Sequence, residues 1–198
     1  METRTEVKPA RERILDAAAT VMREKGLANA TTKAIAAEAG YSEAMLYKHF
    51  ADKQELFLLV LKERLPALRP ALAEAGTGDL SANLTAIVTQ LLDYFAELFP
   101  MSVSIFSAPD LLAQHREGIA RHGGWGPTGP IRMLDGYLQS ERAAGRIRSS
   151  ADTTTAAQLL VGVAFHQGFL AAFEGERTVA NAASLAESSV AAILPALL

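Results

Sequence analysis

The chain has 198 residues, of which 49% are apolar and 21% are charged, and its formal net charge is −3. Such a chain can bury a sizeable core, so we expect a soluble globular protein with one small and one medium domain. Cysteine is absent, which excludes disulfides, cysteine nucleophiles and cysteine-ligated metal sites.

Neither a secretory signal nor a membrane span is predicted. The first thirteen residues are charged and hold no apolar run. The longest apolar stretch, residues 159–173, is interrupted by His166 and Gln167. We therefore expect a cytoplasmic protein without a membrane partner.

Charge is distributed unevenly along the chain. All lysines lie in the first third, and the residues up to Arg64 include eleven basic and ten acidic side chains. The remainder has eight arginines and twelve acidic residues. This asymmetry has the sign expected of an amino-terminal nucleic-acid-binding domain, but it is modest and supports that interpretation only weakly.

A first helix is predicted over residues 10–26. Its apolar stripe consists of Ile14, Leu15, Ala18, Val21 and Met22. Gly26 ends the helix, because glycine adopts the left-handed backbone conformation that a helix stop needs. This helix supplies the apolar surface that the next two short helices lack.

Two short helices joined by a tight turn are predicted over residues 32–39 and 43–49. Gly40 ends the first helix, and Ser42 is placed to cap the amino terminus of the second. Ala36 is small enough to stand where two steeply crossing helices touch. A pair of helices with so short a turn has the helix-turn-helix geometry.

In this geometry the second helix enters the major groove of DNA with its amino-terminal residues nearest the bases. The base-facing residues predicted on this ground are Ser42, Glu43, Ala44 and Met45. Side-chain donors and helix amino termini contact phosphates. These contacts position the protein on DNA and do not specify a sequence. The other residues assigned to the DNA-binding surface are Thr31, Thr32, Lys33, Tyr47, Lys48, His49 and Lys53. Phosphates repel the Glu43 carboxylate, so we assign it a cytosine amino group as its donor.

The run T-x-x-x-I-A-x-x-A-G-Y-S-x-x-x-L-Y-x-H-F-x-x-K-x-x-L resembles the DNA-binding domain of the TetR family of bacterial transcriptional regulators. The resemblance covers residues 11–60, with apolar, small, aromatic and basic positions in register. Amphipathic packing alone could explain the apolar spacing and could place Tyr47 and Phe50 in a core. It does not explain why several donors would share one surface, and we expect binding to double-stranded DNA.

The predicted fold class is all-α: a three-helix helix-turn-helix DNA-binding domain followed by a larger antiparallel helical ligand-binding and dimerisation domain. The first domain covers residues 1–51, a fourth helix connects over residues 52–75, and the larger domain covers residues 76–198. The fourth helix begins at an acidic capping box, residues 52–55. Further helices are predicted over residues 81–100, 109–121, 130–144, 153–173 and 179–194.

No catalytic arrangement, cofactor motif or metal site is predicted. The sequence lacks H-E-x-x-H, G-x-S-x-G, a P-loop and a dinucleotide-binding glycine pattern. His115 and His122 are seven residues apart, which separates them by two helical turns and is too far to share a metal. An enzyme is therefore disfavoured.

The larger domain carries more bulky side chains than the packing of its alanine-rich helices requires. Each aromatic could be ordinary core, but ligand sites are also mostly apolar with a few polar anchors, and the family resemblance implies an effector cavity in this domain. The pocket residues assigned on this basis are Phe95, Phe99, Phe106, Trp125, Met133, Tyr137, Phe165, His166 and Phe169. Because no basic cluster awaits a phosphate, the expected small-molecule effector is apolar or aromatic.

Small residues recur along the last two predicted helices and leave flat strips where another helix can approach closely. In water such strips more often indicate packing within a chain, but the family resemblance implies a four-helix dimer interface. The interface residues assigned by resemblance are Ala164, Gly168, Ala172, Ala183, Ala186 and Val190. A seven-residue reading helix contacts only a few base pairs, so a homodimer with two half-sites, and hence a palindromic operator, is expected.

The sequence thus predicts a homodimeric repressor that an effector releases from its operator. A ligand-dependent activator would carry the same features. The rival from another class is a helical small-molecule-binding protein without DNA function, and salt-dependent duplex binding distinguishes the two.

Overall fold

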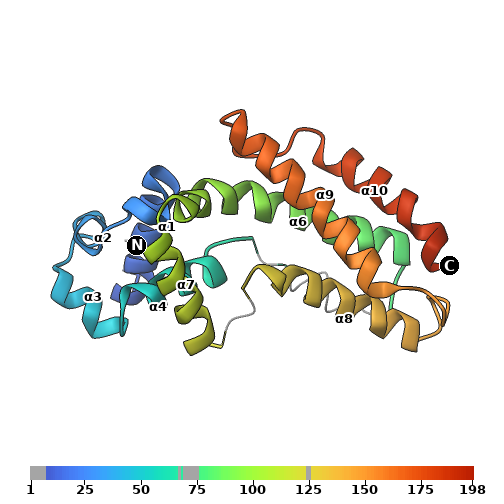
Figure 1. Ribbon diagram of the computed structural model, residues 1–198, viewed down its shortest axis with the longest axis horizontal. Helices are drawn as coiled ribbons and strands as arrows, with labels where there is room; N and C mark the ends of the chain where they lie inside the picture. The colour runs from blue at the N-terminus through green and yellow to red at the C-terminus, as the bar shows by residue number, and fades with distance from the viewer. Residues whose placement is uncertain (1–7, 67, 69–75, 124–125) are drawn as a thin grey trace, which may run out of the picture. The chain divides into compact units, whose positions relative to one another are not determined.

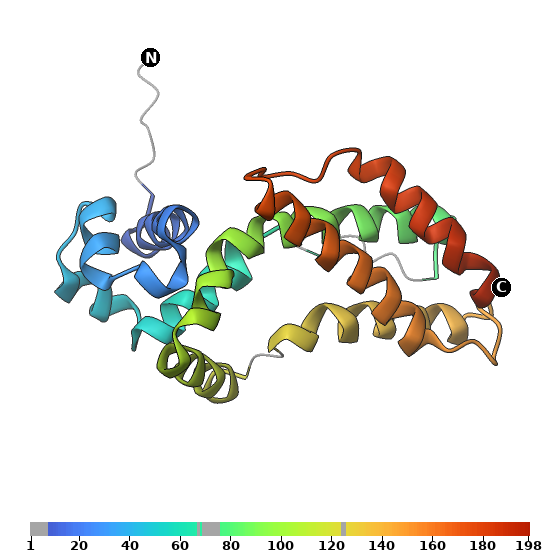
Figure 2. The same cartoon turned by 45° about the horizontal axis from the view of Figure 1, so that its top comes forward.

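The computed structural model describes residues 8–66, 68, 76–123 and 126–198, and every regular element in these ranges is a helix. The all-α prediction is therefore confirmed. Contacts divide the chain into two compact units (Figures 1 and 2). Unit 1 comprises Met1–Leu65 and Pro100–Gly123, and unit 2 comprises Pro66–Phe99 and Gly124–Leu198.

Unit 1 is built around the first helix. Its elements are α1 (Ala10–Asn29), α2 (Thr32–Ala39), α3 (Glu43–His49), α4 (Lys53–Glu63), η1 (Val103–Ser107) and α7 (Pro109–Arg121). Helix α1 packs against α2 and α4 (Figure 1). The largest side chains with less than 2% exposure in this unit include Ile14, Leu15, Ile35 and Phe57. Burial of each such side chain stabilises the folded state by about 1.5–3 kcal/mol relative to leaving it exposed. This packing supports the two short helices α2 and α3.

Pro100–Gly123 pack on α1 and α4, although the sequence placed them in the larger domain. Two glycines permit the close approach. A Cβ atom at Gly26 would stand 2.6 Å from the Oγ atom of Ser104, and one at Gly118 would stand 3.1 Å from the Cβ atom of Gln54. These contacts join residues far apart in the chain, so helical periodicity alone could not reveal them.

Unit 2 is a helical bundle with one apolar core. Its elements are α6 (Leu80–Ser102) as far as Phe99, η2 (Gly126–Thr128), α8 (Gly129–Ala143), α9 (Thr153–Phe173) and α10 (Ala182–Leu197). Helix α9 packs on both α8 and α10 (Figure 2). By length and composition α9 could cross a membrane, yet core helices of soluble proteins pass the same test, and α9 contributes Ala157, Leu160 and Ala164 to the buried core.

Side-chain caps fix several helix starts at the predicted residues. The Thr31, Ser42 and Asp52 side chains accept hydrogen bonds from the backbone N–H groups three residues later, at the starts of α2, α3 and α4. Helix α4 ends at Glu63 rather than extending to residue 75 as predicted. Of the remaining predicted helix, residues 64–75, positions 67 and 69–75 lie outside the described residues.

A buried carboxylate fastens the loop before α6 in unit 2. Glu141 is fully buried and accepts from Arg146 through both carboxylate oxygens, and from the N–H of Gly76 at 3.0 Å. The Arg146 guanidinium also donates to the carbonyl oxygens of Thr77 and Gly78. The hydrogen bonds from Arg146 hold the pKa of Glu141 below its ordinary value.

Loss of this ion pair should destabilise the Arg146→Ala variant by an amount that depends on pH. In the native protein the lowered pKa of Glu141 means that its stabilising contribution is present at neutral pH and is lost as the pH falls below about 4.5. Without Arg146, burial disfavours the ionised Glu141, and the remaining hydrogen bond from the N–H of Gly76 offsets this only in part, so the variant is most destabilised at pH 7. We expect the difference in urea midpoint between the two proteins to shrink between pH 7 and pH 4.

Glu141→Gln serves as the control, because it removes the titrating carboxyl and keeps the side-chain volume. Its urea midpoint should differ from that of Arg146→Ala most at pH 7. A midpoint difference between native protein and Arg146→Ala that is constant over this pH range would show that the ionised Glu141 is not the cause.

Candidate nucleic-acid interface

Gly40 forms the corner between α2 and α3. Its φ of 73° and ψ of 33° are left-handed, a conformation that costs an L-residue with a side chain roughly 1–2 kcal/mol. The Tyr41 N–H donates to the carbonyl oxygen of Ala36 at 2.9 Å, and the Gly40 N–H donates to that of Ala37 at 3.1 Å. These bonds satisfy the carbonyl end of α2 and turn the chain within three residues.

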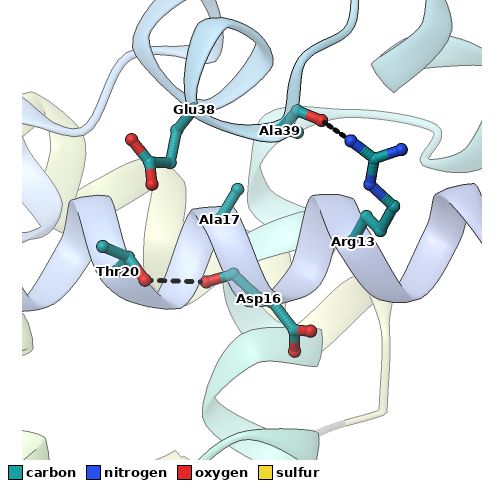
Figure 3. Close-up of a pocket in the computed structure, with 6 residues that line it drawn as sticks. All are labelled: Arg13, Asp16, Ala17, Thr20, Glu38 and Ala39. Atoms are coloured by element: carbon teal, nitrogen blue, oxygen red, sulfur yellow. Dashed lines mark hydrogen bonds between the residues drawn. The ribbon is translucent and has the colours of Figure 1, made fainter. Parts of the chain in front are cut away.

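Arg13 on α1 holds this corner from the other side. Figure 3 shows its side chain reaching up to the carbonyl oxygen of Ala39, to which Nη2 donates at 3.0 Å. Its Nη1 donates to the Tyr41 hydroxyl at 3.2 Å, and the guanidinium carbon lies 4.8 Å from the centroid of the Tyr41 ring. The positive charge at the carboxyl end of α2 also complements the helix dipole. Sequence analysis missed Arg13, because the residues it joins are more than 25 positions apart.

Helix α3 buries one edge and exposes the other. Leu46 and the following Phe50 are 2% and 3% exposed, so they anchor the helix to unit 1. The Tyr47 side chain is 54% exposed, the highest value among the large apolar side chains of α1 to α4. The residues of the predicted interface that are exposed on and before this helix are Ser42, Glu43, Ala44, Tyr47, Lys48 and His49, while Met45 is half-buried.

The other residues predicted to contact DNA differ in exposure and in whether their side chains already have partners. Thr31 and Lys33 are exposed at the amino end of α2. Thr32 is half-buried, and its hydroxyl donates to Glu43. Lys53 is half-buried, with Nζ 4.9 Å from the centroid of the Phe57 ring, and burial lowers its pKa. Lys53 is thus partly committed to its own helix, unlike Lys33.

Three arginines of unit 1, Arg11, Arg64 and Arg121, are engaged in ion pairs. Arg11 binds the Glu63 carboxylate through two nitrogens, at 3.0 and 2.8 Å, and these bonds lower the pKa of Glu63. Arg64 pairs with Asp16 at 2.8 Å. At the start of α4, Arg121 of α7 pairs with the N-cap Asp52 at 2.9 Å. These pairs join helices to one another, so exposed positive charge near the α2–α3 corner comes from Lys33 and Lys48.

Two hollows formed by described residues are small. One, of about 220 Å³, lies between α1 and α2, with Arg13 and Glu38 on opposite sides of Ala17 (Figure 3). The other, of about 290 Å³, lies between the start of α9 and the end of α10 and is lined by Leu159 and Ile193 among others. Both fall short of the roughly 300–1,000 Å³ typical of small-molecule sites.

The residues of the predicted effector pocket lie in different surroundings, and the pocket stays a prediction. Phe95 and Tyr137 are buried in the core of unit 2, where burial raises the pKa of Tyr137 to about 12, and Phe99 and Met133 pack against that core. Phe165, His166 and Phe169 are exposed on α9. Phe106 is 72% exposed in unit 1, and Trp125 lies outside the described residues. Helical spacing identified the aromatics but not which side of each helix faces the core.

Four of the six predicted dimer residues are core residues of a single chain. Ala164, Gly168, Ala186 and Val190 are buried, and a Cβ atom at Gly168 would stand 2.6 Å from the Cβ atom of Phe95. At these four positions the small residues pack within the chain, and the assignment of the strip to a subunit interface stays a prediction. Ala172 is half-buried and Ala183 is exposed.

The exposed face of α9 instead carries large apolar side chains. They are Leu159 (53% exposed), Phe165 (51%), Phe169 (44%) and Phe173 (80%).

Among the described residues no group of three or more His, Cys, Asp or Glu side chains could hold a metal ion.

Comparison with known proteins identifies the amino-terminal domain. Residues 14–60 match the profile of bacterial regulatory proteins of the tetR family. An uncharacterised HTH-type transcriptional regulator of Bacillus subtilis, YvkB, is 29% identical over 143 residues, which cover 72% of this chain and 73% of that protein.

Solved structures share the whole fold. A putative TetR-family regulator from Mesorhizobium loti superimposes with a TM-score of 0.69 at 24% identity, covering 98% of each chain. The regulator FadR of Bacillus subtilis, solved in complex with stearoyl-CoA, gives a TM-score of 0.66 at 17% identity and covers 94% of this chain and 99% of that one. At these identities the likeness shows the fold alone.

Proposed function

We propose that the chain is a DNA-binding transcriptional regulator of the TetR family, whose profile residues 14–60 match, and that it is a homodimeric repressor of a palindromic operator. The observation that carries the proposal is the α2–α3 corner, which leaves Tyr47, Lys48 and His49 exposed together on one short helix. Leu46 and Phe50 anchor the opposite edge of that helix, so the exposed edge is held ready for a groove rather than needing to be ordered.

In the proposed complex α3 lies in the major groove and its first turn faces the bases. Ser42, Ala44 and Met45 would contact base edges, and Tyr47, Lys48 and His49 would bind phosphates. At the amino end of α2, Lys33 and the free backbone N–H groups would bind a further phosphate. The ion pair between Arg121 and Asp52 would fix the exit from α3 and so its angle to the rest of unit 1.

We propose that a second copy of the chain covers the exposed face of α9. Large apolar side chains such as Phe173, which is 80% exposed, are unusual at the surface of a soluble monomer when they gather on one helix. A two-fold pair of chains would present two reading helices to half-sites about 34–36 Å apart. The operator would then be palindromic.

Phe173→Ser tests this interface without a cost to the fold, because the side chain is mostly exposed. Aromatic anchors at interfaces are worth 2 kcal/mol or more, so we expect the dimer dissociation constant to rise about 30-fold or more. Analytical ultracentrifugation over a concentration series measures it. Phe106→Ser is the matched control, since Phe106 is 72% exposed but lies on η1. A dissociation constant unchanged by Phe173→Ser and raised by Phe106→Ser would place the interface elsewhere.

An effector would act by favouring a state in which the two heads no longer fit consecutive grooves. Its effect on DNA affinity cannot exceed its own preference for that state. We propose that it is apolar or aromatic and binds in unit 2, where the ring of Phe165 on α9 contacts the rings of Phe95 and Phe99.

Selection of bound fragments from a random duplex pool tests the proposal. The expected product is an inverted repeat whose half-sites are centred about one helical turn apart, or a multiple of it. Enrichment of a single, asymmetric site would contradict the palindrome, and no enrichment above background would favour the helical ligand-binding protein without DNA function.

A further inference from the structure

A side-chain hydrogen bond that could not be predicted from the sequence joins α2 and α3, the two helices of the helix-turn-helix (here called the reading head). The hydroxyl Oγ1 of Thr32, the first residue of α2, donates to Oε2 of Glu43, the first residue of α3, at 2.9 Å. Glu43 is exposed on the side predicted to face the bases. The bond therefore fixes an acidic side chain where a ligand would meet it.

Thr32 differs in this from the hydroxyl residues beside it. Thr31 and Ser42 are caps, whose oxygens accept from the N–H groups of Ala34 and Met45. A capping hydroxyl keeps its own proton free to donate to a phosphate. Thr32 has a single hydroxyl proton, which it donates in the hydrogen bond to Glu43. A phosphate at this helix end would be left to Thr31, Lys33 and the backbone.

Anchoring changes what Glu43 can do. A free glutamate has three rotatable side-chain bonds and would turn away from phosphates, whereas one fixed at Oε2 has fewer orientations and keeps Oε1 as an acceptor. An ionised carboxylate accepts hydrogen bonds and donates none. In the major groove it is matched by the N4 amino group of cytosine, whereas guanine and thymine present acceptors, and adenine places the N7 acceptor beside its amino group.

We infer that Thr32 is a positioning residue, which holds Glu43 so that its carboxylate selects a cytosine in each half-site. The inference rests on the proposed DNA-binding function, and on the cytosine contact expected of Glu43 from the sequence. It goes beyond them by giving Thr32 the role of aligning the Glu43 carboxylate. Thr32 itself then carries no direct contact with DNA.

The test compares two duplexes for each protein: the fragment selected by the native chain, and the same fragment with the cytosine nearest α3 replaced by thymine. The native chain should prefer the first by about tenfold or more. Thr32→Val keeps the side-chain shape and removes the donor, so this preference should fall several-fold while affinity for the thymine duplex stays within about twofold. Glu43→Ala should remove the preference, and Thr32→Ser should restore it by restoring the hydroxyl.

Lys33→Ala is the matched control, because a lost phosphate contact weakens both duplexes equally. If Thr32→Val also weakens both equally, Thr32 is a phosphate donor and the inference is wrong. If Thr32→Val changes neither affinity, or Thr32→Ser fails to restore the preference, the hydrogen bond does not position Glu43. A native chain that binds no duplex would overturn the proposed function, and this assignment with it.

Discussion

Gly168→Ala is expected to lower the free energy of unfolding by about 1–3 kcal/mol, although alanine is the better helix former. The added Cβ would stand 2.6 Å from the Cβ of Phe95 and 2.8 Å from its backbone carbonyl carbon. Backbone cannot rotate away as a flexible side chain can, so α6 and α9 must separate and loosen the core around them. Urea unfolding of the full chain measures the loss.

Gly162→Ala is the internal control on the same helix. Gly162 is exposed, and nothing lies within 4 Å of the position its Cβ would take. Only helix propensity acts there, so this variant should be more stable than the native chain by up to about 1 kcal/mol. Equal stability of Gly162→Ala and Gly168→Ala would show that α6 and α9 do not approach so closely at Gly168.

Lys48→Ala is expected to weaken binding to every duplex by on the order of tenfold or more at physiological salt, because each subunit loses one phosphate contact. The sequence preference should not change. In a plot of log affinity against log salt concentration the slope should become shallower by about 0.9 per subunit. Fluorescence anisotropy with a labelled duplex at several salt concentrations measures both quantities.

Lys62→Ala controls for the loss of one positive charge from the chain. Lys62 is exposed on α4, nine residues beyond Lys53 and so about 13 Å further along the helix axis. Its removal should leave the salt slope unchanged. Equal slopes for the Lys48 and Lys62 variants would mean that overall charge, rather than the exposed edge of α3, governs binding.

Local signals in the sequence were sufficient to predict the reading head. Thr31, Gly40 and Ser42 are start and stop signals that act within one helical turn, so α2 and α3 have the predicted bounds. The same holds for α9, whose N-cap Asp152 accepts from the N–H of Thr155. Which DNA contacts these helices make is still a prediction.

Long-range contacts account for what the sequence did not reveal. Nothing near Ser104 indicates that it packs against Gly26, so the placement of Pro100–Gly123 with the helix-turn-helix could not be predicted. Helical spacing also cannot tell which stripe of an apolar helix faces inward. Along α9 the small residues, such as Gly168, face the core and the phenylalanines, such as Phe173, face outward, the reverse of the expectation.

Duplex binding as a function of salt concentration tests the central claim most directly. If the exposed edge of α3 meets the phosphates of DNA, affinity for the selected fragment must fall linearly on a log–log scale as salt rises, by orders of magnitude between about 50 and 200 mM when several phosphates are bound. An affinity for duplex DNA that is absent at 50 mM salt, or that does not change with salt, would contradict the account.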